Sequence, residues 1–165
     1  MALVVEDGTG KADAESLASV AAFKAHCDGR GLTYGADSAV EILLRKGTDY
    51  LGQAYHSQLA GRRVSSTQAL DWPRYEVPRR DVAFVDYYPS DAIPPEVVKA
   101  CIEAALRADA GELSPDLSQA VKREKVGQIE TEYQDFSTGR TTYPVIDSLM
   151  APFLRAAGGL RLTRS

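Results

Sequence analysis

Apolar residues recur every three or four positions in four parts of the chain, which is the spacing of one face of a helix. This pattern predicts helices over about 16–28 and about 38–59. The clearest helical pattern follows Pro94 and Pro95, and a fourth follows Pro144, because proline is favoured in the first turn of a helix. The four segments together predict a small helical core.

The second predicted helix carries a start signal and two weak positions. Ser38 precedes Glu41 by three residues, the spacing of a capping box, in which each side chain binds a backbone N–H of the other residue. Gly47 and Gly52 interrupt the pattern, and glycine is a poor helix former because it loses much backbone entropy. We therefore expect the end of this helix to fray.

The segment after this helix contains turn and loop signals. Ser65 and Gln68 form a second box, which predicts a short turn. Trp72 must end that turn because the residue before a proline avoids the helical region. Residues 73–93 hold three prolines with interleaved aromatics, which is typical of a long ordered loop or a short strand. A loop of this length in a compact domain usually has a function.

A hairpin is predicted over 121–133, where apolar and polar residues alternate beyond the turn at Gly127-Gln128. Ile129 and Tyr133 would lie on its inner face. Basic residues of the first strand would face acids of the second and form a charge ladder, while the exposed edge could pair with a strand of an adjacent subunit. These basic residues are Lys122, Arg123 and Lys125.

The composition fits one folded domain, since 44% of the 165 residues are hydrophobic and 25% are charged. We expect a mainly α fold with a β-hairpin (α+β), in which about four helices and the hairpin form one domain over 1–157 and a flexible tail follows over 158–165. The sequence shows no secretory signal and no apolar run near the roughly 20 residues that cross a bilayer. Cys27 and Cys101 are expected to be reduced, as in a cytoplasm.

The charges are unevenly distributed along the chain, whose formal net charge is −4. Residues 81–120 carry eight acids and two bases, whereas 60–80 hold five arginines against two acids and 140–165 four arginines against one acid. Such a mosaic suits either complementary patches between protein subunits or an ordinary solvated surface. The broad basic face of a dedicated nucleic-acid binder is missing.

The familiar catalytic and phosphate-binding motifs are not found in the sequence. Residues 8–11 resemble the end of a phosphate loop, but Val5 stands where that loop needs a glycine and Ala12 where it needs Ser or Thr. The histidines and cysteines lack the spacing of metal ligands, and no nucleophile elbow is present. The sequence therefore predicts a protein that is not an enzyme and that uses no metal or cofactor.

Arginines are interleaved with the single tryptophan over nineteen residues of the chain. The residues are Arg62, Arg63, Trp72, Arg74, Arg79 and Arg80. They could stack unpaired bases and hold phosphates, or they could anchor a protein interface, in which Trp and Arg are common. Alternatively, the tryptophan could fill the core with arginine stems packed over it.

Several blocks of sequence, in the same order along nearly the whole chain, resemble a known family. They lie at 2–10, 48–51, 61–64, 68–74, 93–94, 121–127 and 143–144, and the most specific are Trp72-Pro73-Arg74 and Lys122-Arg123-Glu124-Lys125. The family is a group of tailed-bacteriophage proteins described as DnaT-like single-stranded-DNA-binding proteins. Similarity to this family implies a small phage protein encoded among head and tail genes. The family also looks like the head–tail adaptor type, which implies mainly helical subunits.

On this resemblance we interpret the chain as a head–tail adaptor, or connector: a structural virion protein made in the bacterial cytoplasm and located at the neck. Its expected partners are further copies of itself in a ring, a dodecamer by the resemblance, together with the portal protein and a tail or tail-completion protein. Genomic DNA would pass through the lumen without sequence-specific contact, and no membrane is involved. The tail residues Leu160, Arg161 and Leu162 would become ordered on docking and join the candidate interface.

Two alternatives accompany this interpretation. The chain could be a single-stranded-DNA-binding replication protein, with Arg62, Arg63, Trp72 and Arg74 as the contact set. It could also be a tail-completion factor. We favour the adaptor because the net negative charge and dispersed arginines fit a ring around a DNA passage better than a groove that grips a strand.

Overall fold

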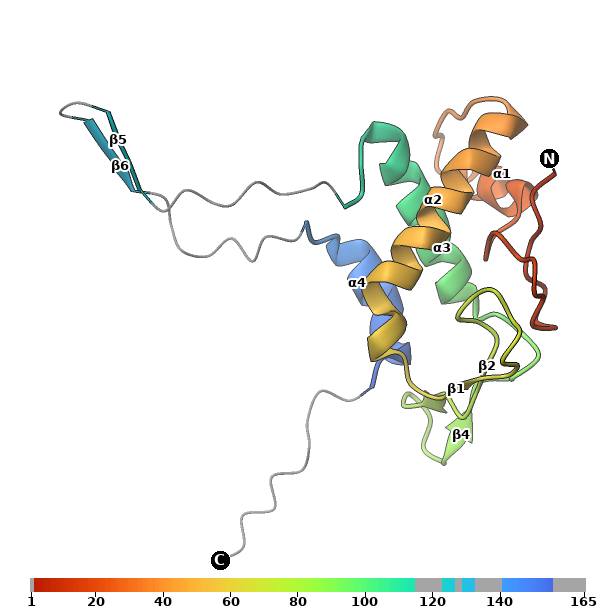
Figure 1. Cartoon of the computed structure of the whole chain (residues 1–165). Coiled ribbons are helices and arrows are strands. Elements are labelled where there is room, and N and C mark those ends of the chain that lie inside the picture. The colour runs from red at the N-terminus through yellow and green to blue at the C-terminus, as the bar shows by residue number, and fades with distance from the viewer. Residues whose placement is uncertain (1, 115–122, 127–128, 133–140, 156–165) are drawn as a thin grey trace, which may run out of the picture.

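Four helices and three short antiparallel strand pairs make up the fold, seen in a computed structural model that describes residues 2–114, 123–126, 129–132 and 141–155 (Figure 1). The helices are α1 (Val20–Asp28), α2 (Asp37–Tyr55), α3 (Pro95–Ala110) and α4 (Pro144–Met150), with 3₁₀ turns η1 (His56–Gln58) and η2 (Ala151–Phe153). The strands are β1 (Arg62–Arg63), β2 (Arg74–Tyr75), β3 (Pro78–Arg79), β4 (Asp86–Tyr87), β5 (Arg123–Val126) and β6 (Ile129–Glu132). The expectation of a mainly helical α+β fold is confirmed.

The crossing of α2 and α3 forms the centre of the core (Figure 1). A Cβ added at Gly47 of α2 would lie 2.7 Å from the carbonyl oxygen of Cys101 and 2.8 Å from the backbone nitrogen of Ala105 on α3. The two helix backbones approach this closely because α3 presents small, fully buried side chains there. Gly47 is therefore required by the packing between the helices. At Gly52, such a Cβ would have no atom within 4 Å. Of these two glycines, only Gly52 therefore weakens the helix without a packing reason.

Helix α1 begins later than predicted, and the capping box predicted for α2 is wrong. Ser19 caps α1 by accepting a hydrogen bond from the backbone N–H of Ala22 at 3.1 Å, so the helix begins four residues later than the predicted residue 16. The cap position of α2 is Ala36, whose side chain makes no capping bond. Ser38 already lies in the first turn of α2, so the predicted capping box does not form.

The N-terminal segment is wound around the buried carboxylate of Glu6. This carboxylate accepts hydrogen bonds from four backbone N–H groups, those of Asp7, Gly8, Gly10 and Lys11. Gly8 has a φ of 102°, and a Cβ there would collide with the carbonyl oxygen of Asp91, just before α3. The segment that resembles a phosphate loop thus directs its backbone N–H groups to the carboxylate of Glu6.

The proline-rich segment contains short strands, one of the two structures predicted for it. Strand β1 pairs with β2, and β3 pairs with β4, both antiparallel. The predicted turn before them is present, since Gln68 Oε1 accepts from the backbone N–H of Ser65 at 2.8 Å. At Gly61, φ is 70° and a Cβ would collide with the carbonyl oxygen of Tyr75, so the chain enters β1 through a glycine.

The predicted hairpin is confirmed as the pair β5–β6, with Arg123 opposite Glu132 and Lys125 opposite Glu130. Ile129 begins β6 and pairs with Val126. Five of the candidate interface residues and the predicted tail lie outside the described residues. These are Lys122 and Tyr133 of the hairpin region and, in the tail 158–165, Leu160, Arg161 and Leu162, so five positions in all carry no structural account.

Cys27 and Cys101 are both buried and are not joined by a disulfide. Burial raises the pKa of the Cys101 thiol, which lies 3.2 Å from the hydroxyl of Thr48. Both cysteines therefore act as small core residues, as expected. Within the described part of the chain, no helix is long and apolar enough to span a bilayer.

Candidate nucleic-acid interface

The β1–β2 ribbon separates the arginines into two sets. Arg62 pairs with Tyr75, and Arg63 pairs with Arg74. Because neighbouring residues of a strand point to opposite faces, Arg62 and Tyr75 lie on one face of the ribbon and Arg63 and Arg74 on the other. Their burial agrees with this: the first pair is exposed, whereas Arg63 is half-buried and Arg74 buried.

Trp72 lies in the core, with only 1% of its surface exposed. Its ring meets Phe153 of η2 edge-on at a centroid distance of 5.3 Å, and Phe153 also contacts Tyr88 at 4.9 Å. Trp72 therefore joins the loop before β2 to the end of the last helix. Its faces are covered by protein, so Trp72 is not a stacking platform at the surface. It fills the core instead, which was one of the alternatives.

Arg74 is also a structural residue, with 5% of its surface exposed. Its guanidinium donates to the carbonyl oxygens of Ala60 at 2.8 Å, Gly61 at 3.0 Å and Asp71 at 3.2 Å. Burial lowers the pKa of this guanidinium. Arg74 thus holds the entry to β1 against β2 and does not reach a ligand at the surface, which removes it from the predicted DNA contact set.

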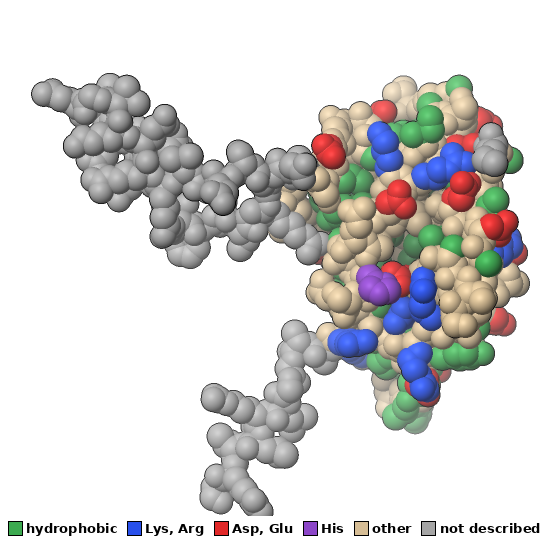
Figure 2. All heavy atoms as spheres, viewed as in Figure 1, with side chains coloured by type: hydrophobic (Ala, Val, Ile, Leu, Met, Phe, Trp, Pro, Cys, Tyr) green, Lys and Arg blue, Asp and Glu red, His purple; other side chains and the backbone are tan. Residues whose placement is uncertain are grey.

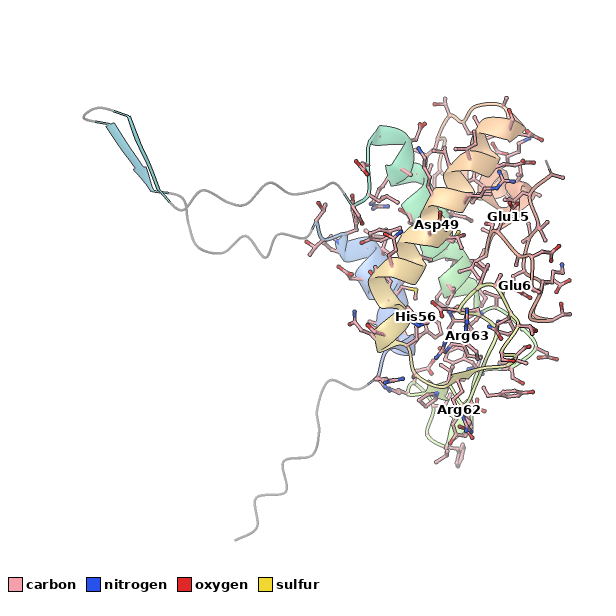
Figure 3. All side chains as sticks on the ribbon, viewed as in Figure 1. Glu6, Glu15, Asp49, His56, Arg62 and Arg63 are labelled. Carbon is pink, nitrogen blue, oxygen red and sulfur yellow. The ribbon has the colours of Figure 1, made fainter. Side chains whose placement is uncertain are left out.

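Arg63 belongs to a polar cluster around the carboxylate of Asp71. Its Nη2 donates to the carbonyl oxygens of Ala69 at 3.1 Å and Leu70 at 2.9 Å, and its Nε lies 3.7 Å from Asp71 Oδ1. The same Asp71 oxygen is 2.6 Å from Nδ1 of His56, which is largely exposed at the end of α2. Figure 3 shows His56 and Arg63 near each other between α2 and the ribbon.

Arg62 occupies the outer face of the ribbon, at the end of the molecule away from α1 (Figure 3). Its Nη2 is 2.8 Å from Oε2 of Glu76, and both side chains are well exposed. Glu76 has a φ of 58°, an uncommon conformation for a residue with a side chain, and marks the sharp turn out of β2. Beside them, Tyr75 is 47% exposed.

The β3–β4 ladder adds further arginines and aromatic rings at the same end of the molecule (Figure 1). The guanidinium of Arg79 lies 4.8 Å from the centre of the Tyr88 ring and 3.3 Å from Asp86 Oδ2, and Arg80 donates to the carbonyl oxygen of Leu154 at 2.8 Å. Phe84 is 84% exposed, more than any other aromatic ring among the described residues, and Tyr87 is 49% exposed.

We call this surface the arginine–aromatic end. It consists of Arg62, Tyr75, Arg79, Arg80, Phe84 and Tyr87. Figure 2 shows basic and apolar side chains gathered together at this end of the molecule. Rings that can stack and cations that can meet phosphates are the two components of a surface that binds single-stranded nucleic acid.

A family described as "Putative DnaT-like ssDNA binding protein" matches residues 1–165. The chain belongs to this family. No match was found among curated proteins or among solved structures.

Membership in this DnaT-like family corrects the main functional interpretation. The family is described by single-stranded DNA binding, which was the alternative, so the interpretation of the chain as a structural head–tail adaptor of the virion is wrong. The ring of subunits, the portal and tail partners and the location at a virion neck were derived from that interpretation and stay predictions. Among the described residues, no group of three or more His, Cys, Asp or Glu side chains is placed to hold a metal.

Only part of the DNA contact set expected for a DnaT-like protein lies at the surface. Arg62 is exposed, and Arg63 is half-buried beside α2. Tyr75, Phe84 and Tyr87 were absent from the expected set. Their signal was the run of aromatics without periodicity between prolines, since aromatic residues outside any helical or alternating pattern need not face a core.

Proposed function

We propose that the chain binds single-stranded DNA through the arginine–aromatic end. The observation that carries the proposal is the exposure of three rings, Tyr75 on β2, Tyr87 on β4 and Phe84 in the connection between β3 and β4. The exposed arginines Arg62, Arg79 and Arg80 lie on or next to the same strands. A ring stacked on an unpaired base contributes about 1–3 kcal/mol whatever the base, because every base has a π-face. Leaving such rings in water has no benefit for folding.

Two arginines of this end, Arg62 and Arg79, can exchange their carboxylate partners for phosphates. The ion pairs of Arg62 with Glu76 and of Arg79 with Asp86 join exposed side chains. Pairs of this kind contribute only about 0–1 kcal/mol, so the closely spaced phosphates of a strand can displace the carboxylates. The acids nevertheless limit the positive potential, and we expect binding of moderate affinity that weakens steeply with salt.

The arrangement favours single strands over duplexes. Bases in a duplex have their faces covered by neighbours, so protruding rings have nothing to stack on. We propose, on the resemblance of the sequence blocks to tailed-bacteriophage proteins, that this activity serves phage genome replication, where single strands arise.

The test is the binding of a labelled oligonucleotide, followed by fluorescence anisotropy at low and at physiological salt. We expect the single strand to bind more tightly than the duplex of the same sequence. Phe84→Ala should weaken binding about 5- to 100-fold, the equivalent of one lost stacking contact. Ile42→Ala is the matched control, because Ile42 is an exposed apolar residue on α2, away from the ladders.

Two results would contradict the proposal. One is equal affinity for single strand and duplex. The other is an affinity that Phe84→Ala and Ile42→Ala change to the same extent, which would mean that the most exposed ring of the arginine–aromatic end does not touch the DNA.

A further inference from the structure

A pocket of about 280 Å³ lies between α2 and the loop before β2. Its floor is apolar and its rim is polar. The floor includes Leu17, Leu51, Leu59, Val97 and Met150, and the rim includes Asp49, Gln53, His56, Arg63 and Asp71. Figure 3 shows Asp49 on α2 and, beyond the end of that helix, His56 near Arg63. The volume is at the lower end of the range for small-molecule sites, so the pocket suits a single ring system.

Two buried N–H groups that belong to residues of this pocket have no hydrogen-bond partner among the described residues. They are Nε1 of Trp72 and Nε of Arg63. Buried donors in native proteins are nearly always paired with protein or with ordered water, so these two N–H groups are the donors that an acceptor in the pocket would meet. The carboxylate of Asp49 likewise makes no hydrogen bond to the described residues and lies at the rim.

The pocket and one part of the arginine–aromatic end, Arg62 with Tyr75, lie on opposite faces of the β1–β2 ribbon. Arg63 lines the pocket, whereas its neighbour Arg62 stands on the outer face. The thickness of a single two-stranded ribbon therefore separates them. A strand whose phosphates meet Arg62 would therefore have to cross the edge of this ribbon to place a base in the pocket.

We propose that the pocket receives one unpaired base of the bound strand. This inference rests on the proposed function and adds a second contact to it. A base has an apolar face for the floor and both acceptors and donors on its edge, for the N–H groups of Trp72 and Arg63 and the carboxylate of Asp49. A phosphate fits the pocket poorly, because it would lie among the carboxylates of Asp49 and Asp71.

The chain offers a clean way to close the pocket. Gly52 lines it, and a Cβ at Gly52 meets no atom within 4 Å. Gly52→Leu therefore adds a side chain beside the pocket whose Cβ meets no atom, at a better helix propensity, and its circular dichroism spectrum and urea midpoint check that the variant folds. Gly52→Ala is the matched control, since it gives the same gain in propensity and leaves most of the space open.

Trp72 provides the readout, because it is the single tryptophan of the chain and lines the pocket. A labelled single strand is titrated while its anisotropy and the tryptophan emission are followed together. For the wild type and for Gly52→Ala, the emission should change in step with the anisotropy. For Gly52→Leu, the emission change should vanish and the affinity should fall about 5- to 100-fold, as for one lost base contact.

The same titration separates failure of the pocket from failure of the proposed function. If the oligonucleotide binds the wild type and Gly52→Leu equally, with constant tryptophan emission, the base pocket is overturned and DNA binding at the arginine–aromatic end stands. If no anisotropy change occurs with the wild type at low salt, DNA binding itself is overturned, and the pocket proposal with it.

Discussion

The α2–α3 crossing and the arginine–aromatic end hold their residues in opposite ways. At the crossing, backbones approach so closely that Gly47 has no room for a Cβ. At the arginine–aromatic end, Arg62 is held by one exposed ion pair and Phe84 is largely surrounded by solvent. The first region supplies stability because any added atom must displace backbone, and the second leaves side chains free to change partners. Substitutions should therefore affect folding at one region and binding at the other.

The largest expected effect is that of truncating the ring that joins the ladders to the core. Trp72→Ala should lower the free energy of unfolding by about 3–5 kcal/mol, because it removes a fully buried ring packed on Phe153. Phe84→Ala should change it by less than about 0.5 kcal/mol, since the ring is exposed. Urea unfolding followed by circular dichroism measures both. Similar losses for the two variants would remove the distinction between core and surface aromatics.

Replacing glycine by alanine should have opposite effects on the free energy of unfolding at two positions of α2. Gly47→Ala should destabilise the fold by about 1–3 kcal/mol, because its Cβ would press on the Cys101 carbonyl oxygen of α3. Gly52→Ala should stabilise it by up to about 1 kcal/mol, through helix propensity in open space. The urea midpoints of the two variants should move in opposite directions. A shift of both in the same direction would show that α2 and α3 can separate at little cost.

At the arginine–aromatic end, removing an acid should strengthen DNA binding. Glu76→Gln frees Arg62 from its partner at 2.8 Å, and an exposed pair worth about 0.2–1 kcal/mol corresponds to about a 1.5- to 5-fold gain in affinity. Anisotropy titrations of the single strand measure the gain. In an Arg62→Ala background, Glu76→Gln should give no such gain. A gain of equal size in both backgrounds would mean that Glu76 acts only through general repulsion of the phosphates.

The helices were largely predictable from sequence because their signal is local and periodic. All four appear where apolar residues recur at helical spacing, and the box of Ser65 with Gln68 forms as its spacing predicts. Errors arise where the reason is tertiary. Helix propensity alone predicted that Gly47 weakens α2, whereas the close approach of the α3 backbone requires a glycine at this position. Ser38 has the spacing of a cap, but α2 begins one residue earlier.

The candidate site was less predictable, since it depends on which face of a ribbon each residue takes. Arg62 and Arg63 are identical neighbours in sequence, yet one stands outside and the other lines the pocket. Trp72 is buried by Phe153, a residue far along the chain that no local pattern connects with it. A sequence segment without periodicity does not indicate which of its aromatic rings will be buried.

The smallest expected effect concerns Asp49, which lies at the pocket rim between the two regions. Nearby protein raises the pKa of its carboxyl by desolvation. The charged form is therefore less favourable in the folded chain than in the unfolded one, so the stability present below the unfolded pKa of about 4 is lost as the pH rises through the folded value. Asp49→Asn should raise the stability at pH of about 7, by less than about 1 kcal/mol because the side chain keeps access to water.

The advantage of Asp49→Asn should disappear at a pH of about 3, where the carboxyl is neutral in both states. Urea unfolding of the wild type and the variant at the two pH values, without DNA, measures it. An equal difference at both values would show that the carboxylate is not desolvated at the pocket rim. Its role as an unpaired acceptor for a base would then lose its physical basis, because a fully hydrated carboxylate gains little from exchanging water for a base amino group.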